Sequence, residues 1–165
     1  MPVWMMFKIR FIQEISSEET DLDIDRYRYM TETKTNFQIL NELITNHIMT
    51  ILNEEMSGWN RIHLYAIGDH WVAFERSAYA LSRIFRDSLP ITVLNLKNYP
   101  FPVIMCSIHY EEIEFGRHAL SFAKKTLDYR LIKIDTINRD EYRAWHDDIV
   151  MDYLGDEDPD ENYCN

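Results

Sequence analysis

The stretch IHLYAIGDHWVAF, residues 62–74, decides how this chain folds. In its first half, side chains alternate with a period of two residues, which predicts a β-strand over residues 62–67. Gly68 and Asp69 follow as a two-residue turn of the kind that joins hairpin strands. Residues 70–74 then return as a second strand, so the stretch predicts a β-hairpin.

A helix capped by Asp69 is the alternative for the second half of this stretch. Large apolar side chains also recur at helical spacing here, namely Trp71, Phe74, Ala78, Leu81 and Phe85. Periodicity alone does not decide between the two structures over residues 70–74. From Ser77 to Arg86 the helical spacing prevails, and we expect a helix there.

Upstream of the hairpin, residues 36–56 predict a long helix. Thr35 and Gln38 have the spacing of a capping box at its start, and Gly58 favours its end. Apolar side chains recur at helical spacing between them: Phe37, Leu40, Ile44, Ile48 and Ile51.

Strands and helices continue on either side of this central part. The expected strands, apolar or alternating in pattern, are residues 3–15, 22–30, 91–96, 103–108 and 129–134. The expected helices are residues 111–127 and 138–155. Asn138 and Glu141 have capping spacing at the start of the second of these helices.

This order of elements predicts a single α/β domain. The chain has 165 residues, of which 46% are hydrophobic and 13% aromatic, enough for one hydrophobic core. Strands interspersed with helices predict a mixed β-sheet flanked by helices. We expect the domain to span residues 1–155, and the acidic residues 156–165 to form a disordered tail.

The net charge of −11 is unevenly distributed. Residues 1–59 carry −5, residues 60–145 carry +2, and residues 146–165 carry −8. Affinity for nucleic acid depends largely on Lys and Arg that neutralise phosphates, so the whole chain is a poor general polyanion binder. The middle segment is nearly neutral, and its basic residues are dispersed in the sequence, which favours solvated helix faces.

The sequence gives no sign of a membrane span, a secretion signal or a metal site. No apolar run approaches the ~18 residues of a membrane span. Lys8 and Arg10 follow the apolar start, whereas a signal peptide places its charge before the apolar stretch. We expect Cys106 and Cys164 to be free thiols in a reducing compartment, and no Cys/His spacing suggests zinc. A cytoplasmic protein without a cofactor is the expectation.

Two segments carry a resemblance to a known family. In residues 62–84, an apolar strand leads into Gly-Asp, an aromatic residue and a helix. In residues 102–114 and 129–134, a proline precedes an apolar strand that runs to a histidine, and a helix and a closing strand follow. Together they resemble the N-terminal mismatch-recognition domain, domain I, of the MutS DNA mismatch repair family. The resemblance covers about residues 60–137 and implies that domain's fold and a role in binding DNA.

The chain departs from the family's motif at the two residues that recognise a mismatch. In the family, the Phe of Gly-Asp-Phe-Tyr-Glu stacks on the mispaired base and the Glu hydrogen-bonds to it. Here His70 occupies the Phe position, and Val72, which cannot hydrogen-bond, occupies the Glu position. His70, Trp71 and Arg76 are the candidate nucleic-acid contacts, because an aromatic ring can still stack on a base.

The histidines do not form a catalytic pattern. Cys106 and His109 fall on opposite faces of one strand, so we expect no Cys–His dyad and a structural, hydrogen-bonded His109. His146-Asp147-Asp148 could orient a base or hold a metal, but we expect these residues on the solvated face of the last helix. We expect His47 in the core or at its boundary. Trp71, like Trp59, Trp145 and the ten tyrosines, is expected in the core or at an interface instead of on a base-stacking surface.

Two functional hypotheses follow. The first is a non-catalytic interaction module with a fold like MutS domain I, which binds a protein partner or a second copy of itself. The missing mismatch-recognition residues and the missing catalytic pattern favour it. The alternative is a DNA-binding protein that retains an altered form of the family's recognition. No membrane partner, cofactor or enzymatic activity is expected.

Overall fold

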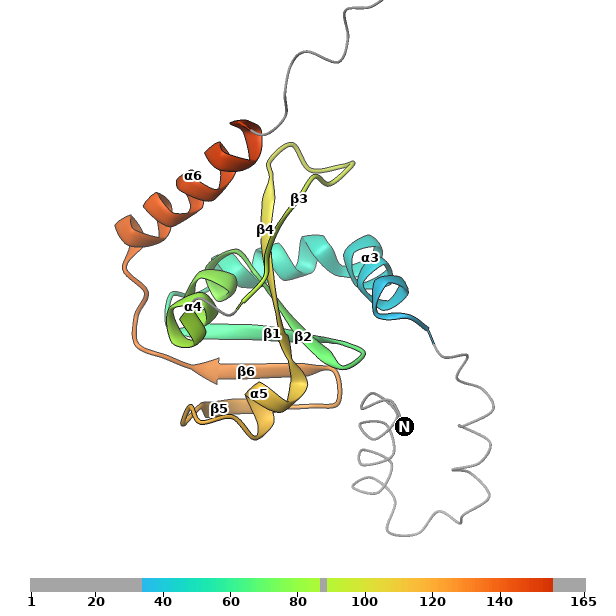
Figure 1. Ribbon diagram of the computed structural model, residues 1–165, viewed down its shortest axis with the longest axis vertical. Coiled ribbons are helices and arrows are strands. Elements are labelled where there is room, and N and C mark those ends of the chain that lie inside the picture. The colour runs from blue at the N-terminus through green and yellow to red at the C-terminus, as the bar shows by residue number, and fades with distance from the viewer. Residues whose placement is uncertain (1–33, 87–88, 156–165) are drawn as a thin grey trace, which may run out of the picture.

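The computed structural model describes residues 34–86 and 89–155 (Figure 1). Its strands are β1 (Arg61–Ile67), β2 (His70–Phe74), β3 (Ile91–Leu94), β4 (Val103–His109), β5 (Ser121–Lys125) and β6 (Tyr129–Lys133). Its helices are α3 (Asn36–Met56), α4 (Glu75–Phe85), α5 (Tyr110–Glu114) and α6 (Arg139–Gly155). The strands predicted over residues 3–15 and 22–30, and the tail predicted over residues 156–165, lie outside the described residues.

The six strands form one sheet in the order β3-β4-β2-β1-β6-β5, and all its neighbouring strands are antiparallel. Helices flank the sheet as the sequence predicts, but the expected mixed sheet is wrong for the described strands. The connections explain why. α4 carries the chain from β2 to the edge strand β3, and the following turn brings β4 back between them. β3 therefore runs parallel to β2 without touching it.

β1 and β2 form the predicted hairpin, and the helical alternative for residues 70–74 is wrong. Ile67 faces His70 across the turn. β2 lies between β1 and β4, so its backbone is hydrogen-bonded on both sides. This pairing outweighs the helical spacing of the apolar side chains, and α4 begins only at Glu75.

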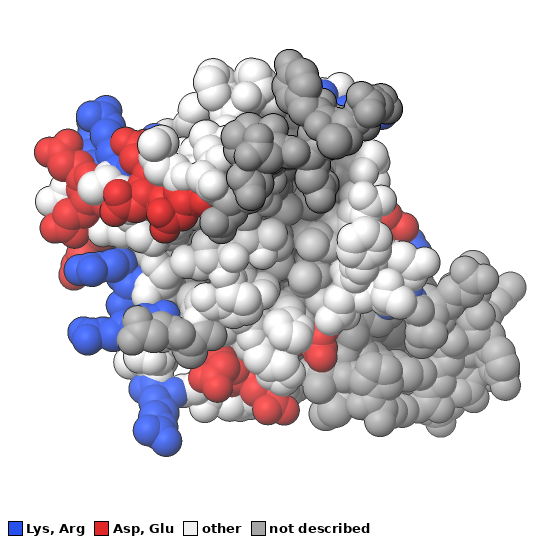
Figure 2. Space-filling model, turned by 45° about the horizontal axis from the view of Figure 1, so that its top comes forward, with Lys and Arg blue, Asp and Glu red and all other residues white. Residues whose placement is uncertain are grey.

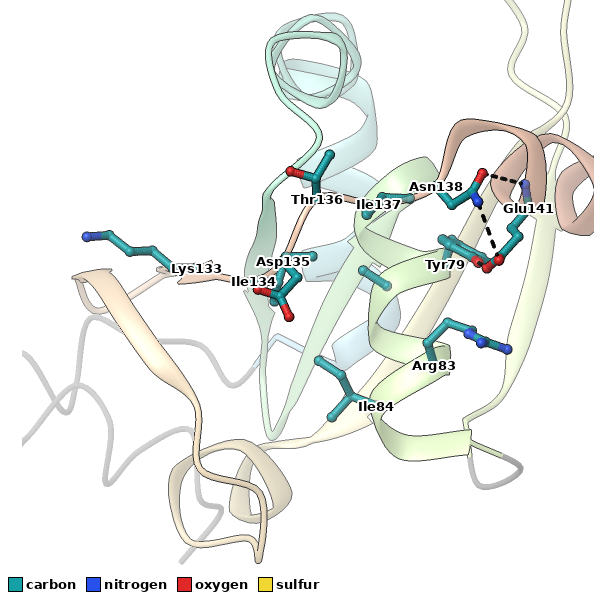
Figure 3. A pocket seen from close by; sticks show the side chains of 11 residues that line it. Tyr79, Arg83, Ile84, Lys133, Ile134, Asp135, Thr136, Ile137, Asn138 and Glu141 are labelled. Atoms are coloured by element: carbon teal, nitrogen blue, oxygen red, sulfur yellow. Dashed lines mark hydrogen bonds between the residues drawn. The ribbon is translucent and has the colours of Figure 1, made fainter.

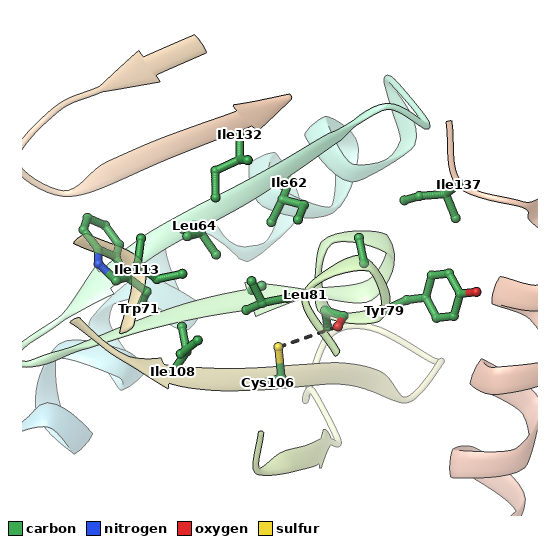
Figure 4. Close-up of a cluster of buried hydrophobic side chains, with 13 residues drawn as sticks. Ile62, Leu64, Trp71, Tyr79, Leu81, Cys106, Ile108, Ile113, Ile132 and Ile137 are labelled. Carbon is green, nitrogen blue, oxygen red and sulfur yellow. Dashed lines mark hydrogen bonds between the residues drawn. The ribbon is translucent and has the colours of Figure 1, made fainter. Parts of the chain in front are cut away.

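Alternation along the strands divides the core into two clusters. The cluster on the α4 side includes Leu64, Trp71, Leu81 and Cys106 (Figure 4). The cluster on the α3 side comprises Ile51, Leu52, Tyr65, Ile67, Val72, Phe74, Val103 and Met105. Burial of these apolar groups supplies the main driving force for folding. Cys106 is a free thiol, as predicted, and burial raises its pKa to about 12.

α3 begins with the predicted capping box. The Thr35 side chain accepts a hydrogen bond from the Gln38 N–H, and the Gln38 side chain accepts one from the Thr35 N–H. His47 is exposed, so its predicted place in the core or at its boundary is wrong. The fully buried residues of α3, Ile51, Leu52 and Glu55, lie in its last turns. Leu40 and Leu43 of the earlier turns are partly buried against the α3-side cluster.

The helix predicted over residues 111–127 is wrong. Only α5 is helical there, and β5 follows as an edge strand. The chain turns tightly at Gly116, where an added Cβ would lie 2.0 Å from the carbonyl oxygen of Glu112. Antiparallel pairing of β5 with β6 then overrides the helical pattern of this segment.

The remaining predicted elements are confirmed to within two residues. β3, β4 and β6 occupy the predicted ranges with small changes at their C-terminal ends. The Asn138 side-chain oxygen accepts hydrogen bonds from the N–H groups of Asp140 and Glu141, at 3.0 and 3.3 Å, and so caps α6.

A buried carboxyl group joins α3 to α4. Glu55 is only 4% exposed. Its Oε1 accepts a hydrogen bond from the Ser77 hydroxyl at 2.6 Å, and its Oε2 accepts one from the Ser77 N–H at 3.0 Å. Burial raises the pKa of Glu55 to about 8, although the bonds from Ser77 act in the opposite direction.

We predict that the protein loses stability as the pH rises from 4.5 to about 8. In this window the folded protein keeps the Glu55 proton that the unfolded chain releases, so the neutral carboxyl stabilises the fold fully only below the window. Glu55→Gln should flatten this dependence, which amounts to a few kcal/mol at most. Urea unfolding at a series of pH values measures it. Glu54→Gln on the same turn is the control and should keep the slope; an unchanged slope in Glu55→Gln would contradict the assignment.

Candidate functional site

His70, a predicted DNA contact, lies at the end of the β1–β2 hairpin opposite His109 of β4. The two imidazole rings are 5.2 Å apart and meet edge to face. Oδ1 of Asp69 lies 2.7 Å from Nδ1 of His70, and its Oδ2 lies 4.0 Å from Nε2 of His109. Asn36 donates a hydrogen bond to the same carboxylate at 2.5 Å. Partial burial raises the pKa of Asp69, but the bonds from Asn36 and His70 outweigh it, so the net shift is downward.

The surroundings of the two histidines can be compared with their predicted roles, a structural one for His109 and a DNA contact for His70. His109 is hydrogen-bonded as predicted: its Nδ1 accepts the Glu111 N–H at 3.3 Å and caps the short helix α5. Beside His70, the Asp69 carboxylate supplies negative charge at a place where phosphate contacts would require positive charge.

The other two candidate DNA contacts lie elsewhere. Trp71 is fully buried in the α4-side cluster, which confirms the core alternative and leaves its ring no surface on which a base could stack. The Arg76 guanidinium lies 3.6 Å from the centre of the Trp59 ring and donates a hydrogen bond to the Glu55 carbonyl at 3.0 Å. The structure therefore does not bring His70, Trp71 and Arg76 together on one surface.

Basic side chains do not form one patch on the visible face of the molecule. Figure 2 shows Lys and Arg along one margin, where Asp and Glu lie among them. Two of the basic residues, Lys125 and Arg130, both bond to Glu114, at 3.1 and 2.7 Å. Such pairing reduces the charge available for phosphate contacts.

One cavity, of about 680 Å³, lies between α4 and residues 133–141 (Figure 3). Its charged side chains do not converge: Figure 3 shows Arg83 and Lys133 pointing away from each other. Glu141 accepts a hydrogen bond from the Tyr79 hydroxyl at 3.1 Å. Asn138 also bonds to Glu141, at 3.5 Å, so the polar groups that meet in this cavity bond to one another.

A second cavity, of about 560 Å³, lies between α6 and the connection from β3 to β4. We call it the α6 groove; its lining residues are Glu75, Tyr99, Phe101, Pro102, His146, Asp147, Val150 and Met151. Phe101 is 65% exposed and Met151 is 69% exposed, and they belong to opposite walls. Apolar walls with a few polar groups at one end are typical of binding sites.

Glu75 forms the polar end of the α6 groove. Its Oε1 accepts the Ile104 N–H at 2.9 Å, and its Oε2 accepts the Tyr142 hydroxyl at 2.6 Å. Nε2 of His146 lies 3.3 Å from the same Oε2. His146 therefore contacts α4, so the prediction of a solvated face is wrong for His146, whereas Asp147 and Asp148 are exposed as predicted. The bond to Glu75 raises the pKa of His146, although partial burial acts against it.

The α6 groove was not predicted from the sequence because three separate segments form it. Glu75, Phe101 and His146 have no shared spacing or motif. A hint lies in Tyr99-Pro100-Phe101-Pro102, which places two aromatic residues in a predicted turn. Of these two, Tyr99 packs against the α3-side cluster, whereas Phe101 is 65% exposed.

Comparisons with known proteins leave the family open. A scan against models of protein families, a search of curated proteins and a search of solved structures each found no match. Among residues 34–86 and 89–155, no group of three or more His, Cys, Asp or Glu side chains could hold a metal ion. In the same part of the chain, no helix has the length and apolar character needed to cross a membrane.

We predict that Gly68→Ala destabilises the hairpin end by about 1–2 kcal/mol. Gly68 has φ +69°, and an added Cβ would lie 1.9 Å from Oδ1 of Asn36, so Asn36 would have to leave Asp69. Chemical denaturation measures the loss. At Gly155 an added Cβ meets nothing within 4 Å, so Gly155→Ala is the control and should change little. Equal stability of the two variants would contradict this account.

Proposed function

We infer that the chain is a non-catalytic interaction module that binds an extended segment of a partner protein in the α6 groove. The observation that carries this proposal is the pair Phe101 and Met151, two large apolar side chains that are mostly exposed on opposite walls of one cavity. Exposed apolar groups around a hollow mark interaction surfaces. Protein interfaces are enriched in aromatic residues and Met, which supports the assignment.

The charge of the surrounding surface indicates the partner's chemistry. Asp147 lines the groove, and Asp148 and Asp152 are exposed on the same helix. Residues 146–155 together carry −3. Complementary charge steers association and excludes partners of like charge. The favoured partner segment therefore combines apolar side chains with basic ones.

We also propose that the chain is related to MutS domain I. Its support is the order of elements: β1, a Gly-Asp turn, β2 and α4 follow one another as in the first segment of the resemblance. β4, α5 and β6 follow in the order of the second segment, with β5 inserted before β6. The short α5 departs from the helix that the resemblance implies.

DNA binding stays the alternative. His70 is partly exposed beside Asp69, and Trp71 is fully buried. Fluorescence anisotropy at low salt, with matched, mismatched and single-stranded DNA, tests this alternative directly. Binding that weakens in His70→Ala would favour it over the interaction module.

We predict that a photocrosslinker placed at Phe101 captures a specific partner in cells that express the chain. Benzoylphenylalanine at Phe101 should give a cross-linked product that Met151→Asp abolishes, because both side chains face the same cavity. The same crosslinker at Phe115 is the control, since Phe115 is 69% exposed but does not line the groove.

Identification of the cross-linked segment completes this test. A synthetic peptide with that sequence should compete for the groove and should contain both apolar and basic residues. Cross-linking to a second copy of the chain would instead indicate self-association. Equal products from Phe101 and Phe115, or a product that persists in Met151→Asp, would contradict the proposed site.

A further inference from the structure

Glu75 is held in a backbone conformation that most residues avoid. Its φ is +47°, in the left-handed region where a side chain is strained. The chain enters α4 directly from β2 at this point, without a loop between them. Non-glycine residues kept in this region often belong to functional sites, where the surroundings fix them. Here the fixed residue is the carboxylate at the polar end of the α6 groove.

The protein places one of its own cationic groups against this carboxylate. Nε2 of His146 lies 3.3 Å from Oε2 of Glu75, and the Glu75 side chain is 15% exposed. The other bonds to Glu75 come from neutral donors, the Ile104 N–H and the Tyr142 hydroxyl. Among the described residues, Arg76 also attracts Glu75 electrostatically. Protonated His146 is the cation whose contact with Glu75 lies in the α6 groove, and it is partly exposed, so a ligand can replace it.

We propose that Glu75 is a binding site for an arginine side chain of the partner segment, whose guanidinium takes the place of His146. This inference rests on the proposed function of the α6 groove. An arginine suits the site because its guanidinium forms charge-assisted hydrogen bonds with a carboxylate and stacks on aromatic rings. Asp147 lies beside His146 on the groove, and Tyr99 and Phe101 supply the aromatic wall.

Competition with His146 makes arginine binding depend on pH. Among the described residues, the charged or titratable groups around His146 are Glu75 from α4, and Tyr142 and Asp147 from its own helix. From the β3–β4 connection, Tyr99 is the titratable residue that lines the groove. The bond to Glu75 raises the pKa of His146, so the protonated form persists to a higher pH than usual. Above that pKa, His146 is neutral and competes less, so affinity for arginine rises with pH. By linkage, arginine binding lowers the pKa of His146.

Two small probes test this site on the full chain. N-acetyl-arginine benzylamide carries a cation beside an aromatic ring, and N-acetyl-citrulline benzylamide is its neutral match. NMR should show the arginine probe shifting the Glu75 and His146 signals and binding about tenfold tighter than the citrulline probe above the His146 midpoint. The arginine probe alone should lower the pKa of His146 in an NMR titration, an effect that a purely structural Glu75–His146 pair would not produce.

Variants of both partners complete the test. Glu75→Gln should remove the preference for arginine. His146→Gln leaves Glu75 in place, so it tests the site even if Glu75→Gln does not fold. This variant should still prefer the arginine probe, but its affinity should no longer depend on pH. Glu141→Gln is the control, since this α6 carboxylate bonds Tyr79 outside the groove.

The outcomes separate this inference from the proposed function. Equal binding of the two probes, or binding of neither, would overturn the arginine site. The proposed function would still stand if the crosslinker at Phe101 captured a partner that depends on Met151. Loss of that capture would overturn both.

Discussion

The arrangement around the α6 groove depends on the hydrogen bonds that the Glu75 carboxylate accepts. It lies at the junction where β2 becomes α4, and it ties that junction to Ile104 of β4 and to Tyr142 of α6. A left-handed backbone at a non-glycine residue costs on the order of 1–2 kcal/mol. Hydrogen bonds to a charged acceptor are among the stronger ones in proteins and offset this cost. One strained residue thereby links the start of α4 to a sheet strand and to the last helix.

The way α6 is attached explains why a groove exists beside it. No residue of α6 is buried, so the helix does not contribute fully buried apolar groups to the core. Polar and aromatic contacts attach it instead: Tyr142 with Glu75, Tyr79 with Glu141, and Tyr153 with Asn95. These contacts hold the helix at a few points, and Met151, which lies between them in the sequence, is 69% exposed.

Local sequence signals predicted much of the fold, and non-local contacts account for the errors. The hairpin turn at residues 68–69 and the cap at Thr35 are set by a few neighbouring residues, and both are confirmed. The segment 111–127 has a weak helical pattern, and only its pairing with β6 decides that part of it is a strand. His47 lies in an apolar stretch, but the sequence does not tell which turns of a helix meet the core.

The same distinction applies to the candidate site. A motif places His70 and Asp69 side by side, and sequence reasoning found that hairpin end. Glu75 and His146 are 71 residues apart in the sequence, and only the folding of α6 back onto α4 brings them within 3.3 Å.

The position of α6 also places part of the chain's negative charge beside the groove. Asp147 lines the groove from α6, and Asp148 and Asp152 are exposed on the same helix. Apolar contact area and negative charge therefore occur at one surface, which favours a partner that offers the opposite charge beside an apolar side chain.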